Sequence, residues 1–160
     1  MSDWTAQAVQ DIEQHPEAIY RLFPQAERRG GAQARARLLA GADARTVAEL
    51  YRRGDAGERL AILRALPGLE LGFDALPLVE DALRTNDARL VEAALASSRW
   101  LDDHAFRQAV LKCVFMSIPL ASISELDRRY DAELARMLAD YAAERQAAGR
   151  QVPQDVLERL

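Results

Sequence analysis

The chain has 160 residues, a formal net charge of −4 and one cysteine, and its composition is 49% hydrophobic and 29% charged. This balance allows a packed core and excludes global disorder, while the acidic net charge argues against a nucleic-acid or anionic-membrane binder, which would carry a basic face. One cysteine excludes an intramolecular disulfide, and no apolar run approaches the roughly 20 residues that a membrane-spanning helix needs.

The amino-acid usage favours helices throughout the chain. Ala occurs 30 times and Leu 22 times, whereas Thr occurs only three times. Ala and Leu stabilise helices, while β-branched residues favour strands. We therefore expect a single all-α domain over residues 1–160, built either as a short α-solenoid of HEAT-like or TPR-like helix pairs or as an irregular helical bundle.

Helix-starting and helix-ending residues divide the first half of the chain into short helices. Pro16 suits the first turn of a helix, Asp43 suits an N-cap, and Asp55-x-x-Glu58 matches a capping box. Glycines and Pro67 end helices between these positions. The expected apolar faces contain, in chain order, Trp4, Ala8, Val9 and Ile12; Ile19, Tyr20, Leu22 and Phe23; Leu38 and Leu39; Val47, Leu50 and Tyr51; and Leu60, Leu63 and Leu66.

Three further helices are expected between residues 74 and 118, starting at Asp74, at Asn86-Asp87 and at Asp102-Asp103. Asp87 follows Asp55 by 32 residues, a spacing typical of two-helix repeats. The expected apolar faces contain, in order, Leu76, Val79 and Leu83; Leu90, Val91, Ala94 and Leu95; and Phe106, Val110, Leu111, Val114 and Phe115.

The last helix is expected to be long, from about Ile123 to Ala148. Ser122-x-x-Glu125 matches a capping box at its start, and Gly149 and Pro153 end it. One stripe of apolar residues runs along it at helical spacing, and the opposite face carries i,i+4 pairs of arginine and carboxylate. The stripe consists of Ile123, Leu126, Tyr130, Leu134, Met137 and Tyr141, and the expected pairs are Glu125–Arg129, Arg129–Glu133 and Arg136–Asp140.

Residues 54–153 resemble the EboA family of bacterial ebo gene clusters. The matching motifs are Gly54-Asp55-x-x-Glu58-Arg59, Leu63-Arg64-Ala65-Leu66-Pro67, Ala82-Leu83-Arg84-Thr85-Asn86, Leu111-Lys112, Leu126-Asp127-Arg128-Arg129 and Tyr141-Ala-Ala-Glu144-Arg145-Gln-Ala-Ala-Gly149-Arg150. The resemblance implies a small partner protein encoded beside a prenyltransferase and hydrolase-like and isomerase-like proteins. It also implies a role in secondary-metabolite precursor processing or export, but it implies no reaction and no cofactor.

Two places in the middle of the chain carry candidate contacts for a partner or ligand. Lys112 is the only lysine among 21 cationic residues and lies in an otherwise apolar helix. It either binds an anion with a partly desolvated ammonium group, or packs its stem and extends its head to water. Arg84 and Asn86 lie between two helices, where they either hold an anion or serve as helix caps.

The last helix and the residues just after it carry the remaining candidates, which are Arg128, Arg129, Tyr141, Glu144, Arg145 and Arg150. Tyr141 and Arg145 share a helix face, so Arg145 either pairs with a buried carboxylate such as Glu58 or Glu80 or lines a cleft. No cluster of His, Cys and carboxylates has metal-ligand spacing, and we expect no metal and no cofactor. Cys113 is interpreted as a core residue.

The sequence leaves enzymatic activity open but favours a non-catalytic role, because no nucleophile, base and orienting group occur together. We expect an interaction or scaffold module that docks a protein partner, for which the resemblance implies other ebo-cluster products. The alternative is a protein that binds an aromatic or prenylated small molecule in an apolar groove. The polar chain start, Met1-Ser-Asp-Trp, lacks the apolar segment of a signal peptide, so we expect a cytoplasmic location.

Overall fold

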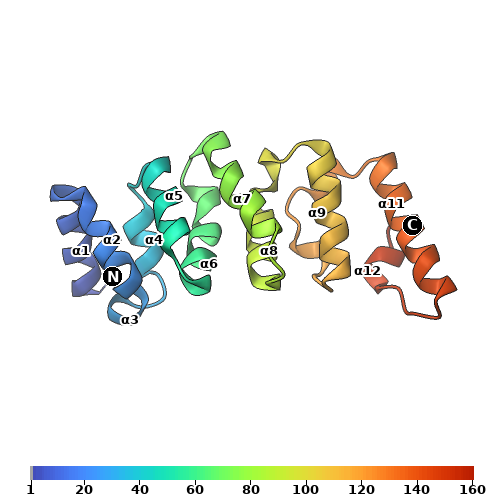
Figure 1. The fold of residues 1–160 in the computed structure, drawn as a ribbon, viewed down its shortest axis with the longest axis horizontal. Helices are drawn as coiled ribbons and strands as arrows, with labels where there is room; N and C mark the ends of the chain where they lie inside the picture. Colours follow the sequence, from blue (N-terminus) through green and yellow to red (C-terminus); the bar gives the residue numbers. More distant parts are fainter. Residues whose placement is uncertain (1) are drawn as a thin grey trace. The chain divides into compact units, whose positions relative to one another are not determined.

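The computed structural model describes residues 2–160 and contains only helices and loops among them (Figure 1). The chain divides into two compact units, Met1–Leu78 and Val79–Leu160. The all-α prediction is confirmed, whereas the predictions of a single domain and of HEAT-like repeats remain predictions. None of the helices in the described part is both long and apolar enough to cross a lipid bilayer.

The first unit is built from six short helices and the first turn of a seventh. Single turns of 3₁₀ helix connect several of them, at Pro16–Ala18, Phe23–Gln25, Leu66–Gly68 and Gly72–Ala75. The helices are α1 (Asp3–Gln14), α2 (Ile19–Leu22), α3 (Ala26–Gly30), α4 (Ala34–Leu39), α5 (Ala44–Arg53) and α6 (Ala56–Ala65), followed by α7 (Leu76–Leu83), in which the unit boundary falls.

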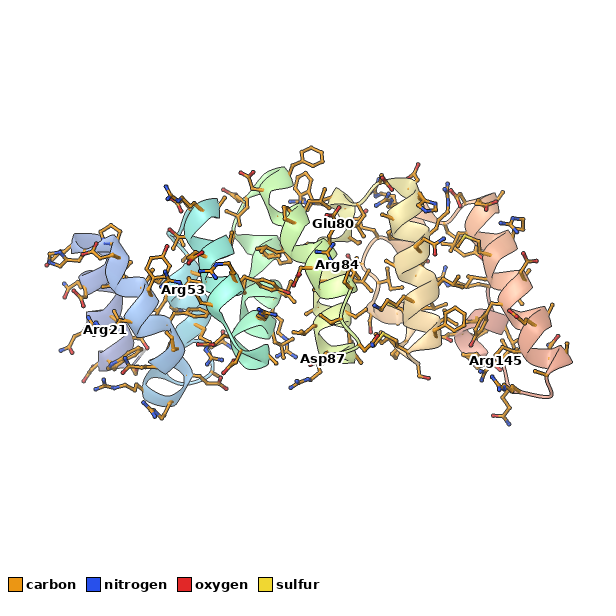
Figure 2. All side chains as sticks on the ribbon, viewed as in Figure 1. Arg21, Arg53, Glu80, Arg84, Asp87 and Arg145 are labelled. Carbon is orange, nitrogen blue, oxygen red and sulfur yellow. The ribbon has the colours of Figure 1, made fainter. Side chains whose placement is uncertain are left out.

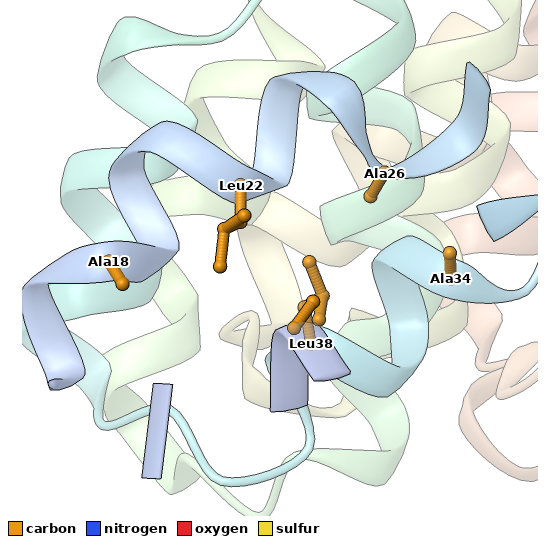
Figure 3. Packing of buried hydrophobic residues seen from close by; sticks show 6 residues of the cluster. Ala18, Leu22, Ala26, Ala34 and Leu38 are labelled. Carbon is orange, nitrogen blue, oxygen red and sulfur yellow. The ribbon is translucent and has the colours of Figure 1, made fainter. Parts of the chain in front are cut away.

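Small side chains let the helices of the first unit approach closely. The core between α1, α2, α3 and α4 is rich in alanine, and Figure 3 shows its buried residues at close range. A Cβ atom at Gly30 would lie 2.4 Å from the Thr5 Oγ1, so only glycine allows α3 to contact α1 there. The buried members of this core are Ala8, Ala18, Leu22, Ala26, Ala34 and Leu38.

The second unit is formed by the rest of α7 and five further helices. They are α8 (Ala88–Ala94), α9 (Asp103–Phe115), α10 (Leu126–Arg129), α11 (Ala132–Ala147) and α12 (Gln154–Leu157), with 3₁₀ segments at Leu95–Trp100 and Leu120–Ser122. Helix α9 contacts both α8 and α11 and lies between them (Figure 1). Its buried Phe106 and Val110, with Leu134 and Leu138 of α11, contribute to the core of this unit.

The predicted N-caps of four helices are confirmed. The side chains of Asp43, Asp87 and Asp102 each accept a hydrogen bond from a backbone N–H in the first turn of the following helix. Asp55 and Glu58 form the full capping box, in which each side chain accepts from the other residue's backbone N–H, at 2.8 and 2.7 Å. These caps satisfy N–H groups that have no partner within the helix.

The predicted continuous helix from Ile123 to Ala148 is wrong. The chain leaves helical geometry at Tyr130 (φ −67°, ψ 117°) and starts again at Asp131, which caps α11 by accepting from the Leu134 N–H at 2.8 Å. Arg107 of α9 binds the same carboxylate through its Nε, at 3.1 and 3.2 Å from the two oxygens. This contact between distant segments stabilises the break, so only 16 residues of the predicted rod form α11.

The predicted capping box at Ser122-x-x-Glu125 is also wrong. Ser122 lies in a 3₁₀ turn and donates through its hydroxyl to the Glu92 carboxylate at 2.8 Å. Ile123 is extended (φ −94°, ψ 104°), so no helix begins there. The helix end is as predicted, because Gly149 adopts the left-handed φ of +69° that a helix-ending glycine favours.

Candidate functional site

Two hollows in the second unit contain candidate residues. The first, the α7–α9 hollow, has a volume of about 340 Å³ and lies between the C-terminal end of α7 and one face of α9. Leu83, Leu101 and Ala109 form apolar parts of its wall. Glu80, Arg84, His104, Gln108 and Lys112 add polar and charged groups.

Lys112 connects the two helices that form this hollow. Its side chain is half-buried, and its ammonium donates a hydrogen bond to the backbone carbonyl of Leu83, the last residue of α7. The last carbonyls of a helix have no partner within it, and a cation there also interacts favourably with the helix dipole. Lys112 therefore caps α7, and its remaining two N–H bonds are free to meet a further acceptor.

Arg84 and Asn86 are not brought together in one anion site. Arg84 lines the α7–α9 hollow one helical turn after Glu80 (Figure 2), and its guanidinium lies 3.5 Å from the Asp81 carboxylate. Asn86 is exposed and does not line the hollow. Asp87, rather than Asn86, caps α8, so a carboxylate already occupies the helix start that an anion would need.

Arg128 and Arg129 are adjacent in sequence but have different surroundings. Arg128 is 70% exposed and pairs only with Glu125, whose Oε2 lies 2.6 Å from its Nε. Arg129 is 11% exposed and donates to the carbonyls of Ser98 and Leu101, at 3.0 and 2.9 Å. Arg129 also pairs with the exposed Asp103 carboxylate at 3.0 Å. Its contacts therefore hold the Leu95–Trp100 segment in place and leave little of its side chain exposed.

Two of the three predicted i,i+4 pairs do not form. Glu125 pairs with Arg128 instead of Arg129, and Glu133 pairs with Arg136 instead of Arg129. The predicted pair Arg136–Asp140 is present at 2.7 Å. The break before α11 rotates Arg129 away from the face that the predicted rod would have given it.

The second hollow, the C-terminal hollow, is an open depression of about 720 Å³ between the end of α11 and α12. Arg145 and Arg150 line it together with Pro153 and Leu157, and no acidic residue does. Arg145, labelled in Figure 2, donates through its Nε to the Gln151 carbonyl at 3.0 Å and pairs with neither Glu58 nor Glu80. The two arginines give this hollow two cationic groups, and the nearby Glu158 carboxylate accepts from the amide of the lining residue Gln154 at 3.4 Å.

Tyr141 connects the C-terminal hollow to an exposed aromatic residue. Its ring is buried, the Arg145 guanidinium lies 5.9 Å from the ring centre, and the Phe115 ring packs edge-on against it at 5.2 Å. Glu144 is exposed and does not line the hollow. Phe115 is 65% exposed, although the sequence suggested a core residue. Phe115 continues the apolar pattern of α9, so no sequence signal indicated this exposure.

The side chains that line these hollows include groups that can bind a ligand or a partner. Burial raises the pKa of the Cys113 thiol to about 12, so this cysteine stays a neutral core group at physiological pH. Within residues 2–160, no three His, Cys, Asp or Glu side chains are placed to hold a metal ion. The hollows are lined by cations, amide groups and apolar side chains, with Glu80 and His104 in the α7–α9 hollow. The cations suit a carboxylate, a phosphate or an acidic protein surface.

Comparisons with known proteins place the chain in one context. A family model described as metabolite traffic protein EboA matches residues 40–160. The match includes all of α5 to α12, and with them both hollows of the second unit. Comparison with curated proteins and with solved structures finds no match.

Proposed function

The chain belongs to the EboA family, and we propose that it serves metabolite traffic as a non-catalytic module that docks a protein partner. The docking surface consists of the C-terminal hollow together with Phe115 of α9. The partner is another protein of an ebo-type precursor-processing or export system. Two features carry the proposal: a hollow lined by two arginines and no carboxylate, and an exposed Phe115 whose ring packs on Tyr141, the ring that Arg145 also approaches.

The composition of this surface is that of an interface core. Aromatic residues and arginine are enriched among the residues that dominate binding energy, whereas a scattered exposed side chain carries no such meaning. Phe115 and Arg145 both contact the buried Tyr141 ring, so their positions are held before a partner arrives. A pre-organised anchor lowers the entropy cost of docking.

The charge of the surface specifies the partner's chemistry. Arg145 uses its Nε for Gln151, which leaves its terminal N–H groups for an acceptor, and Arg150 is exposed. Planar guanidinium groups bind carboxylates in pairs of parallel hydrogen bonds. The complementary surface is therefore a protein segment with carboxylates around one apolar side chain that packs against Phe115.

Affinity purification with charge-reversed variants tests this proposal. The tagged chain is purified from its native host as wild type, as the double variant Arg145→Glu plus Arg150→Glu, and as the control Arg128→Glu. Arg128 is an exposed arginine, like Arg150, but lies outside the C-terminal hollow. We expect a co-purifying protein to be retained by the control, lost from the double variant and released by salt, since the contact is electrostatic.

The partner's contact is identified by photo-crosslinking from Gln146, which lines the hollow. A crosslinked peptide rich in Asp and Glu supports the proposal. If every co-purifying protein is retained by the double variant, or if the crosslinked peptide is basic, the C-terminal hollow is not the docking surface. Circular dichroism spectra of all variants check that the fold is retained.

A small-molecule role is the second candidate, favoured by the Lys112 ammonium in the α7–α9 hollow. The volume of about 340 Å³ lies at the lower end of small-molecule sites. An aromatic or prenylated precursor would place its body against Leu83 and Ala109 and its polar end near Lys112. Native mass spectrometry of the purified chain tests this role: a ligand retained by wild type and lost from Lys112→Met supports it, and an identical spectrum for both contradicts it.

A further inference from the structure

The first unit contains a third hollow, which has an apolar floor. This N-terminal hollow has a volume of about 580 Å³, within the range of sites for small organic molecules. Val9 and Ile12 of α1, Ile19 of α2 and Leu38 of α4 form its floor. Leu38 also belongs to the alanine-rich core in Figure 3, so this floor is part of a packed layer.

One stretch of the rim of this hollow has only small side chains. Ala40, Gly41 and Ala42 connect α4 to α5 along the opening. A Cβ atom built on Gly41 would meet no heavy atom within 4 Å, so open space begins directly at this residue. Three small residues in sequence leave room that larger side chains would fill.

The rim also carries charges that are not used within the structure. Arg37 of α4 and Glu13 of α1 both line the opening, and both are exposed. Neither forms an ion pair within residues 2–160, whereas Arg35, two residues earlier, binds Glu27 at 2.7 Å. Asp43, the third charge at the rim, already accepts from the Thr46 N–H at 2.8 Å. Arg37 is thus the cation available to a ligand that enters the hollow.

We propose that the N-terminal hollow binds a small organic molecule with an apolar body and one anionic group, which pairs with Arg37. The floor removes the apolar body from water, and the guanidinium binds a carboxylate or sulfonate. The Glu13 carboxylate repels a second anionic group on the ligand, so the site prefers ligands with a single negative charge. The lining residues 9–39 precede the family-matched segment, so the site extends beyond what family membership describes.

Two fluorescent probes that differ by one charge test the proposal. 8-Anilinonaphthalene-1-sulfonate carries an aromatic body and a sulfonate, and N-phenyl-1-naphthylamine has the same body without the charge. We expect the full-length chain to bind each probe at one site. Arg37→Gln should weaken binding of the sulfonate about tenfold, the loss of one charge-assisted hydrogen bond, and leave the neutral probe unchanged.

A matched pair of glycine variants locates the site. Gly41→Leu adds a large side chain at the opening of the hollow. Gly68→Leu is the control: it adds the same side chain at a glycine that does not line the hollow and where a Cβ atom also meets nothing within 4 Å. Neither glycine has a positive φ, so both variants are expected to fold. Binding of both probes should fall at least tenfold in Gly41→Leu and stay unchanged in Gly68→Leu.

Three results would overturn the proposal. Equal probe binding by the two leucine variants would place the probes elsewhere, and a neutral probe that responds to Arg37→Gln as strongly as the sulfonate would remove the charge argument. A change of molar mass in Gly41→Leu, measured by light scattering, would show that a second copy of the chain covers the hollow. If Gly41→Leu fails to fold, the two-probe comparison in Arg37→Gln decides alone.

Discussion

Replacing Arg129 by methionine should destabilise the second unit, whereas the same change at Arg128 should not. Methionine keeps an apolar stem of similar length but has no N–H to donate. At Arg129 it leaves the Leu101 carbonyl without the guanidinium that donates to it, while the Ser98 carbonyl keeps only the Leu101 N–H at 3.0 Å. The change also removes the pair with Asp103 and the guanidinium that lies 4.3 Å from the Phe106 ring centre.

The magnitude follows from those contacts. A buried carbonyl that loses its donor costs about 1–3 kcal/mol, and a guanidinium over an aromatic ring contributes about 0.5–1 kcal/mol. Because the losses overlap, we expect Arg129→Met to lower the free energy of unfolding by about 2–4 kcal/mol. A unit of this size is stable by only about 4–12 kcal/mol, so the effect is large. Arg128→Met removes an exposed pair and should cost less than about 0.5 kcal/mol.

Each unit contains one tryptophan, which allows the second unit to be followed by itself. Trp4 lies in the first unit and Trp100 in the second, next to the carbonyl that Arg129 binds. In a Trp4→Phe background, the fluorescence of Trp100 during urea unfolding gives the stability of the second unit. Urea midpoints of wild type and the two methionine variants are then compared at constant slope.

Equal destabilisation by the two variants would refute the assignment of different roles to the two arginines. So would a stable Arg129→Met, because a buried contact of this kind cannot be removed without cost. Replacing Arg128 and Arg129 together would not show whether their side chains contact a partner. Any loss of binding would include the loss of structure around Ser98, whose carbonyl Arg129 binds.

Three further outcomes are expected. Hydrogen bonds from the Arg107 side chain and then from the Leu134 N–H lower the pKa of Asp131 from 3.8 to about 2. The ionised carboxylate therefore stabilises the fold above pH 4, and this contribution is lost between pH 4 and 2. In acid titration, Asp131→Asn should lose less stability than wild type over this range. Cys113, with its pKa raised to about 12, should not react with a disulfide reagent at pH 8 until urea unfolds the chain. Asp55→Ala removes a capping box and should cost about 1 kcal/mol in thermal or urea unfolding.

Helix starts and ends were predictable because their causes are local. Asp55 and Glu58 lie three residues apart, and the capping box they form needs nothing beyond one helical turn. Gly149 adopts a backbone conformation that other residues rarely take, so its place at a helix end could be read directly. The all-α class follows from alanine and leucine content for the same reason.

The candidate residues were predictable only as a set, and their roles were not. Lys112 stands out in sequence as the single lysine, yet the Leu83 carbonyl it binds is 29 residues away. Phe115 continues the apolar pattern of its helix, and nothing local indicates that its outer side stays uncovered. Burial depends on which segment packs against a helix face, and periodicity does not contain that information.

The sequence by itself determined the helical class, the family resemblance and the caps at Asp43, Asp55, Asp87 and Asp102, because composition, motifs and caps do not depend on contacts between distant segments. Tertiary structure decided where the last helix begins and which arginine faces inward. Arg107 binds Asp131 from another helix and stabilises the chain break there, and that break turns Arg129 into the protein while Arg128 stays outside. Contacts between distant segments select among conformations that local patterns leave almost equal in energy.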